Sequence, residues 1–405
     1  MAEQQEYRNK VVVRHNWDTD IVDTGAIHDE FNRMWSEVAP SRIVSGPYGE
    51  QKVTGHTAAP DIMRANTLNL VSVADSLEIA EMILQTVSQL KDFLPSRTII
   101  VINDPHLQRP KAWHIDLQIN ETSTKDDSHH GILFETITIW TDQSSAGVLS
   151  SIVAPLLISE LPSFLWWPRG EFSNNAIFED LSQVADRLVF DSARLGNDAH
   201  AVADYRSLID EPTDPIVGDF TWLRLAPWRQ LIAQFFDPVT THRSLEHIDS
   251  VNIAYAQERQ DHSSGFAAAL MVLGWLGSRL KWEVIEPLEA RKSGGWTAFM
   301  AATDSTGRAH EVQIRLTPDF VPGAKFSLRS VEIVTNDGSS GRYIIQRTDH
   351  DDLVTSSETA TTPLVSRMVF SRRHSTVEML GQELQRFGPD RVFEDSIRLA
   401  TQLLP

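Results

Sequence analysis

The sequence predicts an α/β protein with α+β character, built from two modules with mixed sheets flanked by helices. With 405 residues, the chain is too long for one ordinary hydrophobic core. In the first half, apolar runs of strand length alternate with stretches of helical periodicity. One such run, Thr98–Ile102, is almost entirely apolar, which is typical of a strand covered on both faces. Hydrophobic residues make up 41% and charged residues 22%, which is the composition of a globular protein.

The N-terminal part is expected to form an extension, residues 1–62, followed by an α/β domain, residues 63–212. The extension contains a short amphipathic helix, Asp29–Val38, and a loop rich in Gly and Pro, Gly46–Pro60. In the domain, two strands and a helix that begins at Ser76 form a right-handed βαβ unit. The expected strands are Leu68–Val73, Thr98–Ile102, Trp113–Asn120, Phe134–Trp140, Phe164–Trp167 and Arg187–Phe190, with helices at Ser145–Glu160 and Ala201–Ile209 and a hairpin loop at Ser123–His130.

The C-terminal domain is expected to span residues 213–405, because prolines and acids cluster between Asp210 and Asp219. Its order of strand, helix, strand and hairpin repeats the order of residues 68–140, which suggests two modules of similar build. The small–large–small run Gly274-Trp275-Leu276-Gly277 is expected to allow close packing of a helix against a sheet. The expected strands are Ser250–Ala254, Glu283–Ile285, Trp296–Ala302, His310–Leu316, Phe326–Val334 and Arg342–Arg347, with helices at Trp228–Phe236, Ser264–Leu280, Ser375–Phe387 and Asp390–Leu404.

Two adjacent tryptophans stand between prolines in the segment Leu161–Pro168. Neighbouring side chains of a strand point to opposite faces, so Trp166 and Trp167 cannot both enter one core. Either the strand is central and buried on both faces, or one indole is offered to a partner. Tryptophan is over-represented at the energetic centres of protein interfaces, which keeps the second interpretation open.

This segment and four others resemble the OpcA family, the glucose-6-phosphate dehydrogenase assembly proteins. The five segments occur in family-like order and spacing, and they cover roughly residues 30 to 285. They are Arg64–Val71, Leu94–Val101, Leu161–Pro168, Ala185–Ala193 and Asp219–Arg229. The resemblance implies a non-catalytic assembly factor or allosteric activator of the oxidative pentose phosphate pathway. Such a protein binds glucose-6-phosphate dehydrogenase and promotes its active oligomer.

The last of these segments combines aromatic residues with arginines, which is the usual composition of interface hot spots. The same residues would also suit packing between domains, so both interpretations stay open. The candidate residues for partner binding or for a structural signature are Trp166, Trp167, Arg169, Trp222, Arg224, Trp228 and Arg229.

Arginines near the ends of predicted strands suggest an alternative function. Arg169 follows the tryptophans, Arg187 precedes an apolar run and Arg194 comes after it. Because α/β sheets bind ligands at strand ends, these residues could bind a sugar phosphate in an enzyme or a sensor. They could equally form salt bridges with acids that lie close to them in the sequence.

Catalytic and cofactor-binding motifs are absent from the sequence. The chain has no cysteine, which excludes disulfides, thiolate nucleophiles, zinc–thiolate sites and iron–sulfur clusters within it. It contains neither a G-x-S-x-G elbow nor a Walker A motif, and Gly46–Lys52 only superficially resembles the latter. No G-x-G-x-x-G follows the first strand, so no cofactor, and in particular no NADP, is expected to bind.

Histidines are the remaining source of chemistry, and they form no metal-binding motif. His129-His130 lies in a polar loop, and His350-Asp351-Asp352 lacks the pattern of a cation-binding loop. His242 and Glu246 share a helix face, but no H-E-x-x-H is present. These residues are therefore expected to be solvated, and no metal site is predicted.

The net charge of −19 makes nucleic acid and anionic membranes poor partners. The negative charge is better explained by binding to a basic surface of a partner, or by a role in keeping the protein soluble. The polar start, Met1–Glu6, does not resemble a signal peptide, and the longest apolar helical run, Phe266–Leu280, is too short to span a bilayer. The sequence therefore predicts a cytoplasmic protein.

Overall fold

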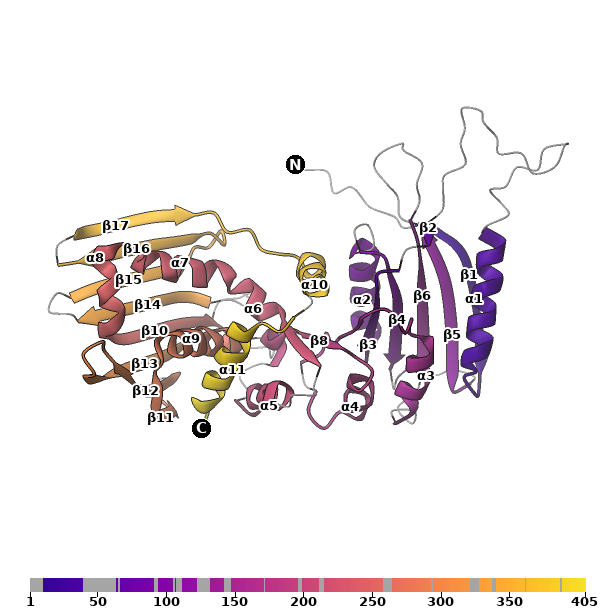
Figure 1. The fold of residues 1–405 in the computed structure, drawn as a ribbon, viewed down its shortest axis with the longest axis horizontal. Helices are drawn as coiled ribbons and strands as arrows, with labels where there is room; N and C mark the ends of the chain where they lie inside the picture. Colours follow the sequence, from indigo (N-terminus) through magenta and orange to yellow (C-terminus); the bar gives the residue numbers. More distant parts are fainter. Residues whose placement is uncertain are drawn as a thin grey trace, which may run out of the picture. The chain divides into compact units, whose positions relative to one another are not determined.

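A computed structural model describes most of the chain as two compact units, and each unit is treated by itself below. The described residues are 10–38, 63–64, 66–90, 94–104, 106, 111–121, 132–141, 147–170, 172–195, 199–210, 215–257, 264–292, 294–320, 328–336, 340–360, 362–386 and 388–405. The first unit takes its residues from 1–168, 174–189 and 376–386, and the second from 169–173, 190–375 and 387–405. Both units combine a mixed sheet with helices, which confirms the predicted fold class (Figure 1).

The sheet of the first unit has the strand order β1-β5-β6-β4-β3-β7-β8, with β2 beside β6. Strands β6, β4, β3, β7 and β8 run parallel to their neighbours in this series, whereas β5 and β1 are antiparallel. The expected βαβ unit is confirmed, because β3 and β4 are parallel neighbours. The strands are β1 (Lys10–Thr19), β2 (Met63–Arg64), β3 (Leu68–Ala74), β4 (Ser96–Asn103), β5 (Trp113–Glu121), β6 (Ile132–Thr141), β7 (Ser163–Trp166) and β8 (Arg187–Phe190).

Helices cover both faces of this sheet. Helix α2 connects β3 to β4, which lies on the β6 side of β3 in the sheet, and α4 connects β7 to β8, which lies on the opposite side. Because right-handed crossovers in opposite directions put their helices on opposite faces, α2 and α4 cover different faces of the sheet. Helix α3 packs against α1 and α4, whereas α2 packs against α10 (Figure 1). These helices are α1 (Thr24–Val38), α2 (Leu77–Leu90), α3 (Leu149–Leu156), α4 (Ala176–Ser182) and α10 (Thr376–Leu384).

The N-terminal extension predicted from the sequence contributes a strand that the sequence did not reveal. Strand β1 pairs with β5 along its whole length, and Arg14 Nε and Nη2 donate to Asp116 at 2.9 and 2.7 Å. The predicted helix at Asp29–Val38 lies within α1, which begins five residues earlier at Thr24. The loops expected at 46–60 and 123–130 lie outside the described residues.

A buried ion pair connects α1 and α3 to the sheet. The Arg97 guanidinium donates from Nε to Glu135 Oε2 at 2.6 Å, and Trp35 Nε1 donates to the other carboxylate oxygen at 2.7 Å. Arg97 Nη1 also donates to the Leu156 carbonyl at the end of α3 at 2.9 Å. Both charged side chains are buried, so each depends on the other for its charge compensation.

The second unit is built on a sheet with the order β11-β12-β13-β10-β14-β15-β16-β17. All neighbours are antiparallel except β10 and β13. In β10, the side chains of Val251, Ile253 and Tyr255 are buried while Asn252 and Ala254 are half-exposed. This alternation shows that the helices cover one face of the sheet. The strands are β10 (Ile248–Ala256), β11 (Glu283–Ala290), β12 (Trp296–Thr303), β13 (Ala309–Asp319), β14 (Leu328–Asn336), β15 (Ser340–Arg347), β16 (Leu353–Thr359) and β17 (Thr362–Val369).

The strand that follows the long helix of this unit, β11, lies at the edge of the sheet and not beside β10. The second unit thus differs from the first, in which the helix α2 joins two neighbouring parallel strands. Its remaining elements are a short strand, two 3₁₀-helices and six α-helices. They are η3 (Ser192–Leu195), α5 (Ala199–Asp210), β9 (Ile216–Asp219), α6 (Phe220–Arg224), α7 (Ala226–Phe236), α8 (Val239–His242), η4 (Arg243–His247), α9 (Phe266–Leu280) and α11 (Arg391–Gln402).

The glycines of α9 mark its closest contact, but the neighbour differs from the one expected. A Cβ atom built on Gly274 would lie 2.0 Å from the Ser396 carbonyl oxygen and 3.1 Å from the Ala400 Cβ, both on α11. The Ser396 hydroxyl donates to the Met271 carbonyl on α9 at 2.6 Å. At Gly274, close packing therefore joins helix to helix and not helix to sheet. No helix among the described residues is long and apolar enough to cross a membrane.

Candidate functional site

The two tryptophans lie at the end of a central strand of the first unit. Strand β7 runs between β3 and β8 and is buried along its whole length. Trp166 and Trp167 are 1% and 0% exposed, and the Trp167 ring meets Phe178 of α4 edge-on with their centroids 5.1 Å apart. Neither indole is displayed on the surface of this unit.

The three arginines of the sugar-phosphate alternative do not share one end of their strands. Arg169 and Arg194 come after the carboxyl ends of β7 and β8, whereas Arg187 opens β8 at its amino end. Arg187 is buried within the first unit and donates from Nη2 to Glu383 Oε2 of α10 at 2.7 Å. This guanidinium is therefore already neutralised by a carboxylate of its own unit.

In the second unit, the segment Asp219–Arg229 begins with a helix cap. The Asp219 carboxylate accepts bonds from the backbone N–H groups of Thr221 and Trp222 at 2.6 and 3.2 Å, so it caps the N-terminus of α6. It also accepts a bond from the Tyr205 hydroxyl at 2.9 Å and two bonds at 3.0 Å from the backbone N–H and hydroxyl of Ser192. One buried carboxylate thus connects η3, α5 and α6.

The aromatic and arginine residues of the same segment contact one another. The Arg229 guanidinium lies over the Trp222 ring, 3.4 Å from its centroid, and donates to the Trp222 carbonyl at 2.9 Å. The Trp222 Nε1 donates to Asp390 Oδ2 at 2.9 Å. Trp228 is 1% exposed, and the Arg347 guanidinium lies 5.5 Å from its ring centroid.

Two carboxylates in this cluster have opposite pKa shifts. Burial raises the pKa of Asp219 to about 6, and the nearby charge of Asp191 acts in the same direction. Burial also disfavours the charged form of Asp191, but Arg224 outweighs it and lowers the Asp191 pKa. Arg224 achieves this by donating from Nη1 and Nη2 to the two Asp191 oxygens at 2.7 and 2.8 Å.

Tyr205→Phe is expected to destabilise the second unit more strongly above pH 7 than at pH 5. Above pH 7 the hydroxyl bonds to a charged Asp219, a bond worth about 1.5–3 kcal/mol, whereas a neutral bond is worth about 0.5–1.5 kcal/mol. The pKa of Asp219 is higher in the folded state than in the unfolded state, so the folded state binds this proton more tightly. The stability that proton binding contributes is fully present below about pH 4 and is lost as the pH rises through about 6. Urea unfolding at both pH values measures the difference.

Tyr255→Phe is the control for this variant, because Tyr255 is also buried but its pKa is raised by burial and not by a carboxylate. Its effect on the unfolding free energy should not change between the two pH values. Equal losses for Tyr205→Phe at pH 5 and pH 7.5 would show that Asp219 does not titrate in this range.

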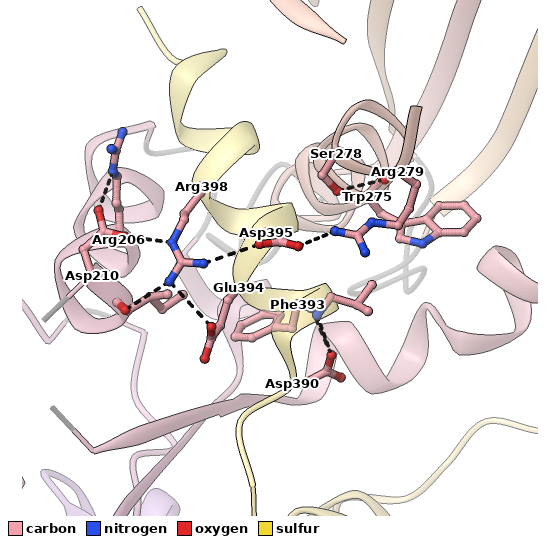
Figure 2. Close-up of polar contacts among 12 residues, drawn as sticks. Arg206, Asp210, Trp275, Ser278, Arg279, Asp390, Phe393, Glu394, Asp395 and Arg398 are labelled. Carbon is pink, nitrogen blue, oxygen red and sulfur yellow. Dashed lines mark hydrogen bonds and ion pairs between the residues drawn. The ribbon is translucent and has the colours of Figure 1, made fainter. Parts of the chain in front are cut away.

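Helix α11 is joined to its neighbours by polar contacts at its surface (Figure 2). Arg398 Nε donates to Asp210 Oδ1 of α5 at 3.0 Å, and Arg279 of α9 pairs with Asp395. Asp390 caps the helix by accepting from the Val392 and Phe393 N–H groups. The arginine pairs are solvent-exposed, and such pairs contribute at most about 1 kcal/mol each. They orient α11 and offer no unpaired charge for a ligand.

The histidine candidates form no metal site within the described part of the chain. Glu246 accepts bonds from the backbone and hydroxyl of Ser305, at 3.1 and 2.6 Å, and His242 Nδ1 lies 3.2 Å from the Phe236 carbonyl. Asp351 pairs with Arg373 and Arg347. His129 and His130 lie outside the described residues.

The most exposed apolar strand is one that the sequence did not predict. Strand β17 ends the sheet of the second unit, and its residues Leu364, Val365 and Met368 are 64%, 53% and 56% exposed. Phe370, directly after it, is 84% exposed. Beside it, residues of α7 and of the segment 367–374 line a cavity of about 390 Å³. This surface has the properties of a protein-binding edge, because unpaired strands with apolar side chains readily pair with other chains.

Two protein-family models match the chain in order. Residues 87–207 match the model of the OpcA family described as the glucose-6-phosphate dehydrogenase subunit N-terminal domain. Residues 215–397 match the corresponding C-terminal domain. The chain belongs to the OpcA family. The resemblance seen in its sequence motifs is thereby confirmed, and the two matches span well over half of the chain.

Curated relatives carry the family name as well. A protein of Synechocystis sp. is 26% identical over 278 residues, which is 67% of this chain and 56% of that protein. A protein of Synechococcus elongatus is 24% identical over 309 residues, 75% of this chain and 66% of that protein. Both are named "Putative OxPP cycle protein OpcA". The chain therefore spans less than two thirds of the length of these relatives.

Solved structures of similar architecture are much more distant. Glucose-6-phosphate 1-dehydrogenase from Mycobacterium avium is 12% identical, with a TM-score of 0.44 and coverage of 84% of this chain and 91% of that one. KijD10, a 3-ketoreductase from Actinomadura kijaniata, is 12% identical, with a TM-score of 0.45 and coverage of 84% and 96%. Neither likeness carries a function over to this chain.

In this chain, the motif segments quoted from the sequence and the exposed edge strand β17 consist of different residues. The tryptophans of both motifs are buried, whereas β17 carries none of the quoted motif segments. The buried tryptophans could be recognised from sequence patterns that indicate burial. The exposed edge strand leaves only two short apolar stretches as a signal, Leu364–Val365 and Met368–Phe370.

Trp167→Ala is expected to cost about 3–5 kcal/mol of unfolding free energy, because it removes a fully buried indole and leaves a cavity. Urea unfolding of the purified variant measures this loss. Trp17→Ala, on the half-exposed edge strand β1, is the control and should cost much less. A Trp167→Ala protein with unchanged stability and lost partner binding would instead assign this indole to an interface.

Proposed function

We propose that this protein is a non-catalytic assembly factor and activator that binds glucose-6-phosphate dehydrogenase and promotes its active oligomer in the oxidative pentose phosphate pathway. The observation that carries the proposal is the ordered match of both halves to the two dehydrogenase-subunit domain models. The name of the curated relatives, which refers to the OxPP cycle, agrees with it. A cytoplasmic location, where this pathway's substrates occur, belongs to the same proposal.

A binding role also suits the surface of the second unit. The edge strand β17 displays exposed aliphatic side chains and an arginine, and the exposed Phe370 follows it directly. The candidate residues Trp222, Arg224, Trp228 and Arg229 are proposed to support the core of the second unit, and Trp166 and Trp167 that of the first unit. Arg169 belongs to the same structural signature.

Activation places a thermodynamic condition on binding. A factor can shift the dehydrogenase toward its active oligomer only if it binds that form more tightly than the inactive one. A tenfold difference in affinity corresponds to about 1.4 kcal/mol of shift. The proposal therefore predicts that the apparent affinity rises under conditions that already favour the active oligomer.

The test uses the purified full chain and the dehydrogenase of the same organism. Size-exclusion chromatography should show a complex, and the chain should raise dehydrogenase activity in a saturable manner while showing no dehydrogenase activity itself. An acidic protein of similar size and charge is the control for non-specific effects. Absence of a complex at micromolar concentrations of both proteins would overturn the proposal.

The sugar-phosphate alternative predicts a different result in the same samples. An enzyme or sensor would bind glucose 6-phosphate by itself, and calorimetry on the isolated chain would detect this. Because Arg187 is already paired with Glu383, we expect no such binding.

A further inference from the structure

Strand β17 has one free edge. The strand order of the second unit ends at β17, which pairs with β16 on its inner side. No described strand pairs with its outer side. The outward backbone N–H and C=O groups of such a strand are a template for a further strand.

The register assigns the side chains of β17 to two faces. Arg367 is opposite Thr355, which is opposite Ile345, and Ile345 is buried on the face that α7 covers. Arg367 and its neighbours two residues away, Val365 and Val369, therefore point toward the α7 side. Met368 points to the opposite face, which no described helix covers.

On the face of β17 that is turned toward α7 lies the cavity of about 390 Å³. Its lining combines amides with cationic groups and some apolar surface. Its lining includes the amides Gln230 and Gln234 and the apolar Leu231 of α7, with Arg367, Arg372 and Phe370. The arginines make this cavity attractive to carboxylates, with which a guanidinium forms paired hydrogen bonds.

The sequence of β17 and of the segment after it is basic. Residues 362–375 contain three arginines and a histidine but no acidic residue, although the chain carries a net charge of −19. Of these arginines, Arg373 is paired with Asp351. An occupant of this edge must therefore combine apolar side chains for one face with acidic side chains for the other. In an extended segment, alternate residues meet these two demands.

We propose that β17 receives an extended segment of the dehydrogenase as an added strand, with alternating apolar and acidic residues. This inference rests on the proposed function and names its docking site. The apolar side chains of the added strand extend the surface of Met368 on the open face. Its acidic side chains enter the cavity beside α7 and pair with Arg367. The main-chain hydrogen bonds supply affinity, and the alternating side chains supply specificity.

A second copy of this chain does not fit the same edge. Pairing β17 with the β17 of another copy would bring two segments of the same basic charge side by side, and like charges on adjacent strands are destabilising. The charge of the edge therefore favours a different, acidic occupant over self-association.

The test compares the affinity of variants of the full chain for the dehydrogenase. Arg367→Glu, which reverses the charge in the cavity, and Met368→Lys, which places a charge on the apolar face, should each raise Kd about tenfold or more. Ile21→Lys is the matched control, because Ile21 is a 79% exposed apolar residue of the first unit. All three side chains are exposed, so the variants should unfold at the temperature of the parent.

Hydrogen exchange of the complex provides the second measurement. An added strand protects every second amide of β17, whereas docking through side chains alone leaves its amides exchanging freely. If the parent binds but both β17 variants bind equally well, the inference is overturned while the proposed function stands. A parent chain that forms no complex overturns both. A parent that forms a dimer by itself, which Arg367→Glu dissociates, would show that the edge serves a second copy and overturn the inference.

Discussion

Gly274→Ala is expected to destabilise the second unit strongly. The added Cβ would lie 2.0 Å from the Ser396 carbonyl oxygen and 2.8 Å from its carbon. These are backbone atoms of α11, so the two helices must separate. Overpacking of a core costs roughly 1–3 kcal/mol and more where backbone must move, and we expect about 3 kcal/mol or more here. The better helix propensity of alanine, about 1 kcal/mol, offsets only part of this.

Gly277→Ala on the same helix is the matched control. Its Cβ would meet Leu399 Cδ2 at 2.2 Å, but this atom is the end of a flexible side chain that can rotate away. We expect a loss of about 1 kcal/mol or less, because a rotamer change costs far less than a backbone shift. Urea unfolding of both variants measures the two losses of unfolding free energy. Equal stability of the two variants would show that α9 and α11 do not pack as closely at Gly274 as described.

Glu135→Ala is expected to destabilise the first unit by about 3–5 kcal/mol. The substitution leaves the buried Arg97 guanidinium without its carboxylate and removes the acceptor of the Trp35 indole. A total stability of about 5–15 kcal/mol makes this a large fraction. Urea unfolding of the variant and of the parent chain measures this loss.

Two further variants show whether this loss comes from the uncompensated charge or from lost packing. In Arg97→Met/Glu135→Leu both charges are replaced by apolar groups of similar size, and most of the stability should return. Glu30→Ala, which breaks the exposed pair with Arg33, should cost less than about 1 kcal/mol. A double variant as unstable as Glu135→Ala would assign the loss to packing and not to the uncompensated charge.

Burial patterns explain why most elements could be predicted from the sequence. Strands β3 and β4 are buried on both faces, so apolar residues occur on both of their faces, as in the run Ile99–Ile102 of β4. The adjacent tryptophans likewise required a strand covered on both sides, and β7 is such a strand. In these cases the local pattern and the final environment agree.

The two edge strands β1 and β17 were missed for the opposite reason. Half of the side chains of β1 face solvent and the other half are only partly covered, so its period-two pattern is weak. Strand β17 is exposed on both faces and therefore shows no alternation at all. The surface proposed to bind a partner is thus hidden from periodicity, because periodicity records burial inside one chain.

Buried charge pairs are also invisible in a single sequence. Arg97 and Glu135 are 38 positions apart and Arg187 and Glu383 are 196 positions apart, so neither pair follows a local spacing rule. Only the fold brings the partners together. For Arg187, the sequence suggested a ligand contact at a strand end, whereas the structure supplies a carboxylate from a distant helix.

Helix α10 has a consequence for the order in which the chain can mature. It packs on α2 and supplies Glu383 to Arg187, yet it is made after the residues of the second sheet. Until α10 emerges from the ribosome, Arg187 of the nascent first unit lacks the carboxylate with which it is paired in the finished fold. A message cut short before Thr376 would yield a chain in which this defect is permanent. Proteases that sample partly unfolded proteins would then remove incomplete chains before they could compete for a partner.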